Sequence, residues 1–286
     1  MNYPITKLSC GECSPLLVEI PDAPKDLYIR GDFPPRDTKC LAIVGSRNYT
    51  NYGKQVVEHL VSGLRGYPIS IVSGLALGID TLAHEAALAA GLHTISVPGS
   101  GIDDSVIYPS RNRGLARKIL ASGGMLLSEF EPTFEATPWS FPQRNRIMAG
   151  LSHAVLLIEA GEKSGTLITA RLTAEYNREL LVVPGNIFSE NSRGVHQFLQ
   201  LGATPVTSSE DILIALGIDA EEQQNTPLSN FTPEEALLLQ VLTDPRDQNT
   251  IIRLLPYSPQ ETLTLLMQLE LNGHIKEQNG MFYIVN

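Results

Sequence analysis

Short apolar runs alternate along the middle of the chain with segments in which apolar residues recur every three or four positions. The apolar runs are Leu41–Gly45, Ile69–Val72, His93–Val97, Met125–Ser128, Ala154–Glu159 and Leu180–Val183. The segments with helical spacing are residues 53–65, 79–90, 111–121, 166–177 and 192–201. Strands this apolar are covered on both faces, which is typical of a parallel sheet. The alternation predicts an α/β fold over residues 39–218, an extended Rossmann-type, doubly wound, mainly parallel sheet.

The segments on either side of this domain have a different pattern. Residues 1–38 are rich in proline and lack periodicity, so we expect an N-terminal extended lead-in that covers an edge of the sheet. Residues 219–228 are mostly polar and predict a linker.

The remainder, residues 229–286, predicts a separate small domain. Thr232 and Pro233 suit the N-cap and first position of a helix. Two short strand-like runs flank Gly280 near the C-terminus. Helical patterns precede them near residues 233–243, 248–254 and 259–272. Three helices followed by a hairpin predict a winged-helix-like domain.

Composition places the chain among globular proteins, with 43% hydrophobic and 18% charged residues. The net charge is −10, so the chain is not a simple basic nucleic-acid binder. Residues 219–286 carry three basic and ten acidic groups, whereas residues 39–218 carry 14 basic and 15 acidic groups. A bound polyanion is therefore expected on the middle domain.

The sequence also limits the compartment and the metal chemistry. No apolar run reaches the roughly 18 residues of a membrane span, and the N-terminus lacks the regions of a secretory signal. We expect a cytoplasmic protein with no membrane partner. Cys10 and Cys13 have the spacing of half a zinc site, but no second pair follows, and Cys40 stands alone. Ordinary thiols and no metal are the prediction.

Glycines and cations follow the predicted strands at the edge where parallel sheets bind ligands. Gly45, Ser46 and Arg47 follow the first strand; a glycine allows close approach, and Ser46 and Arg47 suit a phosphate. A tight turn with a surface arginine is the alternative. The spacing is not G-x-G-x-x-G, so a dinucleotide is not expected. After the second strand, Ser73–Asp80 leads into a helix, where Asp80 is expected to cap rather than catalyse.

Three further loops complete this set. Gly99 and its neighbours follow the third strand. Their exposed backbone could bind a phosphate, and a plain turn is the alternative. Arg144 and Arg146 lie beside Trp139 and Phe141, the combination that single-stranded nucleic acids favour, although the rings also suit a core. The last loop, before the helix at 166–177, offers a lysine with hydroxyl and N–H donors, without P-loop spacing. Its residues are Lys163, Ser164, Gly165 and Thr166.

Catalytic constellations are missing from the sequence. No serine lies in G-x-S-x-G, and no acidic cluster resembles a two-metal site. His84 and His153 have no metal-spaced partner and are interpreted as structural. We predict no catalytic residue, no enzyme activity and no cofactor.

Taken together, these loops resemble the DNA-processing protein A (DprA/Smf) family from about residue 15 to 218, and more loosely over 228–286. The matching stretches are Ile43–Arg47, Ser73–Asp80 with His84, Gly99–Asp103 with Tyr108 and Pro109, Phe141–Ser152, and Glu159–Ala170. The resemblance implies single-stranded DNA binding, a homodimer, and loading of the RecA recombinase on incoming DNA in natural transformation, with displacement of single-strand-binding protein. By motif position, Arg47 and Lys163 would be the main phosphate contacts. Arg144 and Arg146 would line the same groove, and Gly99, Ser164 and Gly165 would allow backbone approach.

Two departures from the family and two rival functions remain. The 38 residues before the first strand are too few for the helical N-terminal domain of many members. The helix at 259–272 has no Lys or Arg, so we expect the winged-helix unit to bind DNA weakly.

One rival is a LOG-like nucleotide phosphoribohydrolase, whose catalytic glutamate position holds Thr169 here. The other is a nucleotide-sensing adaptor. Phosphate contacts by Arg47, Lys163, Arg144 and Arg146 would make the logarithm of the DNA-binding constant fall with the logarithm of the salt concentration, with a slope of about −3.

Overall fold

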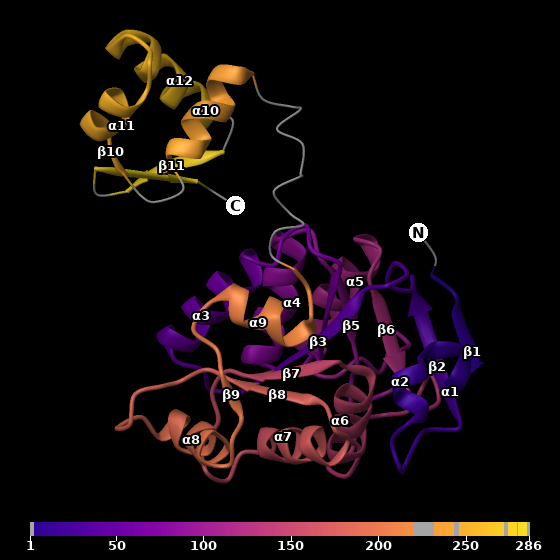
Figure 1. Ribbon diagram of the computed structural model, residues 1–286. Coiled ribbons are helices and arrows are strands. Elements are labelled where there is room, and N and C mark those ends of the chain that lie inside the picture. The colour runs from indigo at the N-terminus through magenta and orange to yellow at the C-terminus, as the bar shows by residue number, and fades with distance from the viewer. Residues whose placement is uncertain (1–2, 220–231, 243–245, 272–273, 279, 285–286) are drawn as a thin grey trace. The chain divides into compact units, whose positions relative to one another are not determined.

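The computed structural model describes residues 3–219, 232–242, 246–271, 274–278 and 280–284. The chain divides into two compact units, residues 1–220 and 221–286 (Figure 1). Most of the predicted linker, residues 219–228, lies outside the described residues.

A nine-stranded sheet forms the centre of the first unit, in the order β1-β2-β6-β5-β4-β3-β7-β8-β9. The strands from β6 to β9 are parallel, whereas β1 and β2 are antiparallel to their neighbours. The strands are β1 Ile5–Ser9, β2 Asp26–Gly31, β3 Lys39–Val44, β4 Ile69–Ser73, β5 His93–Ser96, β6 Met125–Ser128, β7 Ala154–Leu157, β8 Glu179–Val182 and β9 Thr204–Pro205. The expected mainly parallel α/β sheet is confirmed.

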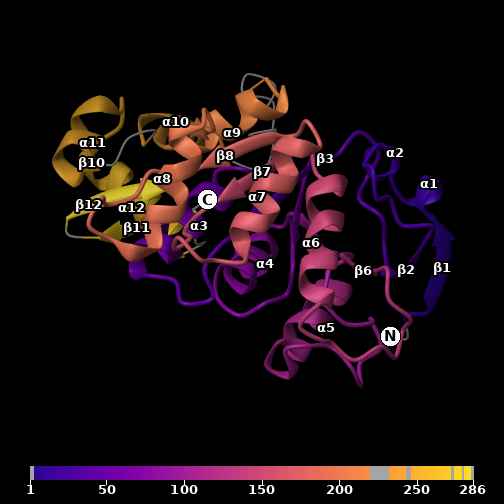
Figure 2. The ribbon, with the colours of Figure 1, turned by 90° about the horizontal axis from the view of Figure 1, so that it is seen from below.

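Helices cover both faces of this sheet (Figures 1 and 2). Alternate residues of β3 enter different cores, because successive side chains of a strand point to opposite faces. Leu41 and Ile43 pack with α3 (Asn51–Ser62), α4 (Ile79–Ala89) and α9 (Ser209–Leu216). Ala42 and Val44 share the other core with α6 (Ser140–Leu151), α7 (Thr166–Glu175) and α8 (Arg193–Gln200). A third cluster places α5 (Arg113–Ala121), which follows the short helix η1 (Ser110–Asn112), against β6.

The N-terminal segment differs from the extended lead-in that the sequence predicts. β1 and β2 extend the sheet beyond β6, and the short helices α1 (Cys10–Cys13) and α2 (Pro15–Val18) connect them. Leu17 and Leu27 are fully buried in the first unit's core. Residues 3–38 are therefore part of the fold.

Helix α6 is the other main difference, because the sequence predicts a loop over residues 141–147. Pro142 lies in its first turn, where a backbone N–H has no intrahelical partner, so proline is tolerated. Ile147 to Leu151 are all buried, as are Arg144 and Asn145. A helix buried on most sides by both polar and apolar residues has no amphipathic stripe for a sequence pattern to detect.

The second unit is a winged-helix domain, as expected. It contains α10 (Pro233–Val241), α11 (Gln248–Leu254), α12 (Pro259–Leu271) and an antiparallel sheet of β10 (Arg246–Asp247), β12 (Met281–Ile284) and β11 (Ile275–Gln278). Thr232 caps α10, accepting the Glu235 N–H at 3.3 Å while its own N–H donates to the Glu235 carboxylate. In the described part of the chain, no helix is long and apolar enough to span a membrane.

Candidate nucleic-acid interface

The sheet reverses its order of connection between β3 and β7. From β3 the chain continues through β4, β5 and β6 to one side, and then returns to place β7 on the other side. The two strands end level with each other, with Val44 paired to Leu157. The loops that leave them diverge to opposite faces, and such a switch point is where open α/β sheets bind ligands.

A cavity of about 600 Å³ opens at this switch point. It is lined by the loops that follow β3, β4 and β7, by α6 and the first turns of α4 and α7, and by a residue after β8. Its lining includes Gly45, Ser46, Arg47, Asn48, Asp80, Phe141, Arg144, Asn145, Lys163, Ser164, Gly165, Thr166, Thr169 and Asn191. Seven of the nine residues that the sequence singled out thus meet here: Ser46, Arg47, Arg144, Lys163, Ser164, Gly165 and Thr166.

Arg47 presents its charge at this cavity. Its side chain is exposed, and the guanidinium carbon lies 5.5 Å from the centre of the Phe141 ring. A cation over an aromatic face is attracted to the ring's electron-rich face without losing its hydrogen-bond donors. Phe141 therefore holds Arg47 in place while leaving the guanidinium available to an anion.

Lys163 brings a second exposed cation from the β7 loop. Within the described ranges it forms no ion pair, whereas its neighbour Glu162 pairs with Arg193 at 3.9 Å. Gly165 has open space where a Cβ would lie, so backbone can be approached there. In the part of the chain that the structure describes, neither Arg47 nor Lys163 has an ion-pair partner, so the loops after β3 and β7 bring two available positive charges to one cavity.

The hydroxyl donors of this loop are already engaged. The Thr166 hydroxyl donates to the Gly45 carbonyl oxygen at 3.1 Å, which ties the β7 loop to the β3 loop. The Thr166 N–H donates to Ser164 Oγ at 3.2 Å, and Ser164 Oγ donates to Thr166 Oγ1 at 3.0 Å. Since α7 begins at Thr166, a bound phosphate would exchange with these internal bonds rather than meet free donors.

Arg144 lines the cavity as a buried cation. Its guanidinium donates to the carbonyl oxygens of Gly74 and Val97, and its Nε donates to Asn145 Oδ1 at 3.1 Å. Burial lowers the pKa of Arg144 below its ordinary value, while the negative charge of Asp80 opposes that shift. Arg144 thus joins the ends of β4 and β5 and adds positive charge from within the wall.

Asp80 is the only acidic residue among the described residues that line the cavity. It accepts the Gly74 N–H at 3.2 Å and the Ala76 N–H at 3.4 Å, which fixes the loop after β4. Burial raises its pKa above the ordinary value, and the charge of Arg144 opposes that shift. Position 169, where the hydrolase rival needs a glutamate, holds a buried threonine. Position 169 therefore does not supply the carboxylate on which that rival depends.

Arg146 and Gly99 do not line the cavity with the others. Arg146 Nη2 donates to both carboxylate oxygens of Glu129, each at 2.5 Å, in an ion pair. Arg144 and Arg146 lie on one helix, about 200° apart around its axis, so they cannot both face the cavity. A Cβ at Gly99 would lie 2.7 Å from the Phe141 ring, which indicates that this glycine is needed for packing.

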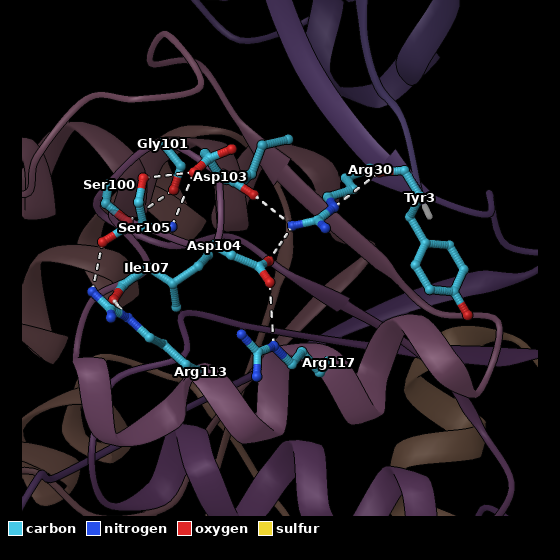
Figure 3. Close-up of polar contacts among 11 residues, drawn as sticks. Tyr3, Arg30, Ser100, Gly101, Asp103, Asp104, Ser105, Ile107, Arg113 and Arg117 are labelled. Atoms are coloured by element: carbon cyan, nitrogen blue, oxygen red, sulfur yellow. Dashed lines mark hydrogen bonds and ion pairs between the residues drawn. The ribbon is translucent and has the colours of Figure 1, made fainter. Parts of the chain in front are cut away.

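The loop after β5 is fixed by a polar network that includes the N-terminal strands (Figure 3). Arg30 on β2 donates to the carbonyl oxygens of Tyr3 and Ile102, and pairs with Asp104. Arg117 of α5 donates to the same carboxylate at 3.2 Å. This loop presents Tyr108, whose ring centre is 5.9 Å from that of Phe141. The N-terminal strands thus support an aromatic pair beside the cavity.

Sequence reasoning missed two asparagines of the lining. The Asn191 side-chain amide donates to the Asn48 carbonyl oxygen at 2.8 Å, and both residues line the cavity. Asn191 follows β8, the strand next to β7, so its position after a predicted buried strand is the signal that could have found it.

Comparisons with known families cover both units. A family model described as DNA recombination-mediator protein A matches residues 5–217, and one described as DprA winged helix domain matches residues 219–281. Protein Smf of Escherichia coli (strain K12) is 35% identical over 275 residues, covering 93% of this chain and 73% of that protein. DNA processing protein DprA of Streptococcus pneumoniae is 41% identical over 203 residues, covering 71% of each.

Solved structures give the same result for the fold. The X-ray structure of DNA processing protein A from Streptococcus pneumoniae aligns with a TM-score of 0.69 and 39% identity, covering 75% of this chain and 74% of that one. A structure of DNA processing protein A from Helicobacter pylori, described for its unique single-stranded DNA binding mode, aligns with a TM-score of 0.66 and 32% identity. It covers 75% of this chain and 96% of that one.

Proposed function

This chain belongs to the DNA recombination-mediator protein A family, and from that premise we propose that it binds single-stranded DNA, without catalysis, at the cavity between β3 and β7. One observation carries the proposal. In a chain with a net charge of −10, the exposed and available cations Arg47 and Lys163 meet at the same cavity.

The chemistry of the cavity fits a phosphodiester backbone. Arg47 forks onto phosphate oxygens, Lys163 adds a point charge, and Arg144 raises the local potential from the wall. Cations that gather at one place can bind a polyanion even when the total charge of the protein is negative. Salt screens the repulsion from acidic groups that lie more than about 10 Å away. The Phe141 ring beneath Arg47 positions the guanidinium for the phosphate contact.

Titration of a fluorescent oligothymidylate against a duplex of equal length, across a range of salt concentrations, tests this proposal. Arg47→Ala and Lys163→Ala are each expected to weaken single-strand binding by about 1–3 kcal/mol. Each should also reduce the salt slope, the magnitude of the slope of log K against log salt concentration, by about 0.7. Neither should affect folding, since both side chains are exposed. Lys118→Ala, which removes an exposed cation from α5, is the matched control and should bind as the wild type does. Wild-type affinity in both cavity variants would reject this placement.

The partners implied by the family resemblance extend the proposal. We propose that the protein acts as a homodimer, and that it loads RecA recombinase onto single-stranded DNA covered by single-strand-binding protein during natural transformation. A second copy would let one strand occupy two cavities, which raises the effective affinity. Size-exclusion chromatography tests the dimer. RecA filament formation on DNA covered by single-strand-binding protein, with the wild type and with Arg47→Ala, tests the loading.

A further inference from the structure

The loop between β8 and α8, residues 184–189, exposes two large apolar side chains side by side. Ile187 is 72% exposed and Phe188 is 86% exposed. Phe188 has the largest exposed fraction among the large apolar side chains of the described residues. Single exposed apolar residues are common, but a pair presented together indicates a contact surface.

The backbone of this loop holds the pair outward. The Ser189 N–H donates to the Asn186 carbonyl oxygen at 3.0 Å, which closes a turn around Ile187 and Phe188. The Phe188 N–H donates to Asn186 Oδ1 at 2.9 Å, a bond that asparagine characteristically makes in turns. Ile187 and Phe188 therefore occupy the two central positions of a hydrogen-bonded turn, and both side chains are largely exposed there.

Hydrogen bonds tie this loop and the residues just after it to the segments that follow β3 and β7. The Tyr52 hydroxyl on α3 donates to the Pro184 carbonyl oxygen at 2.7 Å. Just after the loop, the Asn191 side-chain amide donates to the Asn48 carbonyl oxygen after β3, and the Asn191 carbonyl oxygen accepts the Ala160 N–H after β7 at 2.7 Å. Asn48 and Asn191 both line the cavity, so the chain reaches the cavity wall three residues after Phe188.

We infer that Phe188 is a base-stacking side chain, which takes an unpaired nucleobase next to the phosphates held by Arg47 and Lys163. The inference rests on the proposed function and adds a second element to it. Cations beside an aromatic ring are the combination that binds single strands, because every base offers a π-face when it is unpaired. In a duplex those faces are covered by neighbouring base pairs. Phe188 would thus help the site to select single strands, in addition to the phosphate contacts.

Three probes of equal length test this role in the full-length protein. They are an oligothymidylate of about 20 nucleotides, the corresponding abasic backbone, and a duplex. Phe188→Ala is expected to weaken binding of the oligothymidylate by about 5- to 150-fold. It should leave binding of the abasic backbone and the salt slope unchanged, because no phosphate contact is lost. Phe188→Trp keeps an aromatic ring and should, unlike Phe188→Ala, retain the preference for the oligothymidylate over the abasic backbone.

A matched control and several distinct outcomes make the test decisive. Ile214→Ala on α9, which removes another apolar side chain that is 75% exposed, should behave as the wild type. If the wild type binds oligothymidylate and Phe188→Ala binds it equally well, the inference fails while the proposed function stands. An equal loss on the abasic backbone also overturns it. A change in oligomeric state caused by Phe188→Ala would assign the loop to a second copy instead. Failure of the wild type to bind any single strand overturns the proposed function and the inference together.

Discussion

The guanidinium of Arg144 lies directly against the backbone of Gly74, to whose carbonyl oxygen it donates a hydrogen bond. A Cβ at position 74 would overlap Arg144 Nη1. The loop after β4 and the helix α6 are therefore in contact through a glycine on one side and a buried cation on the other.

Replacing Gly74 with alanine should destabilise the protein, because either Arg144 or the backbone must move. We expect a loss of about 1–3 kcal/mol in the free energy of unfolding, measured by urea denaturation. Gly114→Ala is the control, since a Cβ there meets nothing within 4 Å and the residue lies within α5. That variant should be more stable by about 0.5–1 kcal/mol, owing to the helix preference of alanine. Equal effects of the two substitutions would contradict the packing described.

Replacing Arg146 with alanine should affect stability but not the salt dependence of DNA binding. The substitution leaves the Glu129 carboxylate without its ion-pair partner in a partly buried position, which costs about 1–3 kcal/mol of unfolding free energy. Because Arg146 does not line the cavity, the salt slope for oligothymidylate should match the wild type, whereas Arg47→Ala lowers it by about 0.7. A lowered slope in Arg146→Ala would place that residue on the DNA after all.

His84 should make the protein less stable in mild acid. Burial lowers its pKa to about 3, and its ring lies within 2.8 Å of Thr94 Oγ1. In the unfolded chain this histidine takes up a proton near pH 6.5, whereas in the folded protein it stays neutral. Its contribution to the unfolding free energy is therefore complete above pH 6.5 and is lost as the pH falls towards 3. The loss amounts to at most about 1.4 kcal/mol per pH unit.

The matched measurement is the unfolding free energy at several pH values for the wild type and His84→Asn. The variant should show a shallower fall between pH 6.5 and pH 4. His93 and His153, whose pKa values are also lowered by burial, contribute slope of the same sign to both proteins. Parallel curves would show that His84 does not titrate as described.

Arg30 and Arg117 share the carboxylate of Asp104 but should differ in their contributions to stability. The Arg30 side chain is 14% exposed and donates to two backbone carbonyl oxygens besides Asp104, whereas that of Arg117 is 67% exposed. Arg30→Ala should cost about 1–3 kcal/mol of unfolding free energy, and Arg117→Ala at most about 1 kcal/mol. A larger loss in Arg117→Ala would contradict this assignment of the network.

The sequence by itself determined the order of the buried strands and the loops that follow them. Runs such as Leu41–Val44 and Ala154–Leu157 are apolar because both faces of a central parallel strand are covered, and that condition is local enough to be visible in the pattern. Since the carboxyl ends of parallel strands share one edge, the pattern alone is enough to assign Arg47 and Lys163 to the same edge of the sheet.

Only the tertiary structure decided what those side chains and their neighbours contact. Arg144 and Arg146 are chemically alike and close in sequence, yet the rotation of α6 aims one at Gly74 and the other at Glu129. Thr166 is a phosphate donor by motif, but its hydroxyl donates to the carbonyl oxygen of Gly45, in the loop after another strand. A local pattern reports burial; the partner of a charge or a hydroxyl depends on helix phase and strand register, which arise from contacts between residues far apart in the chain.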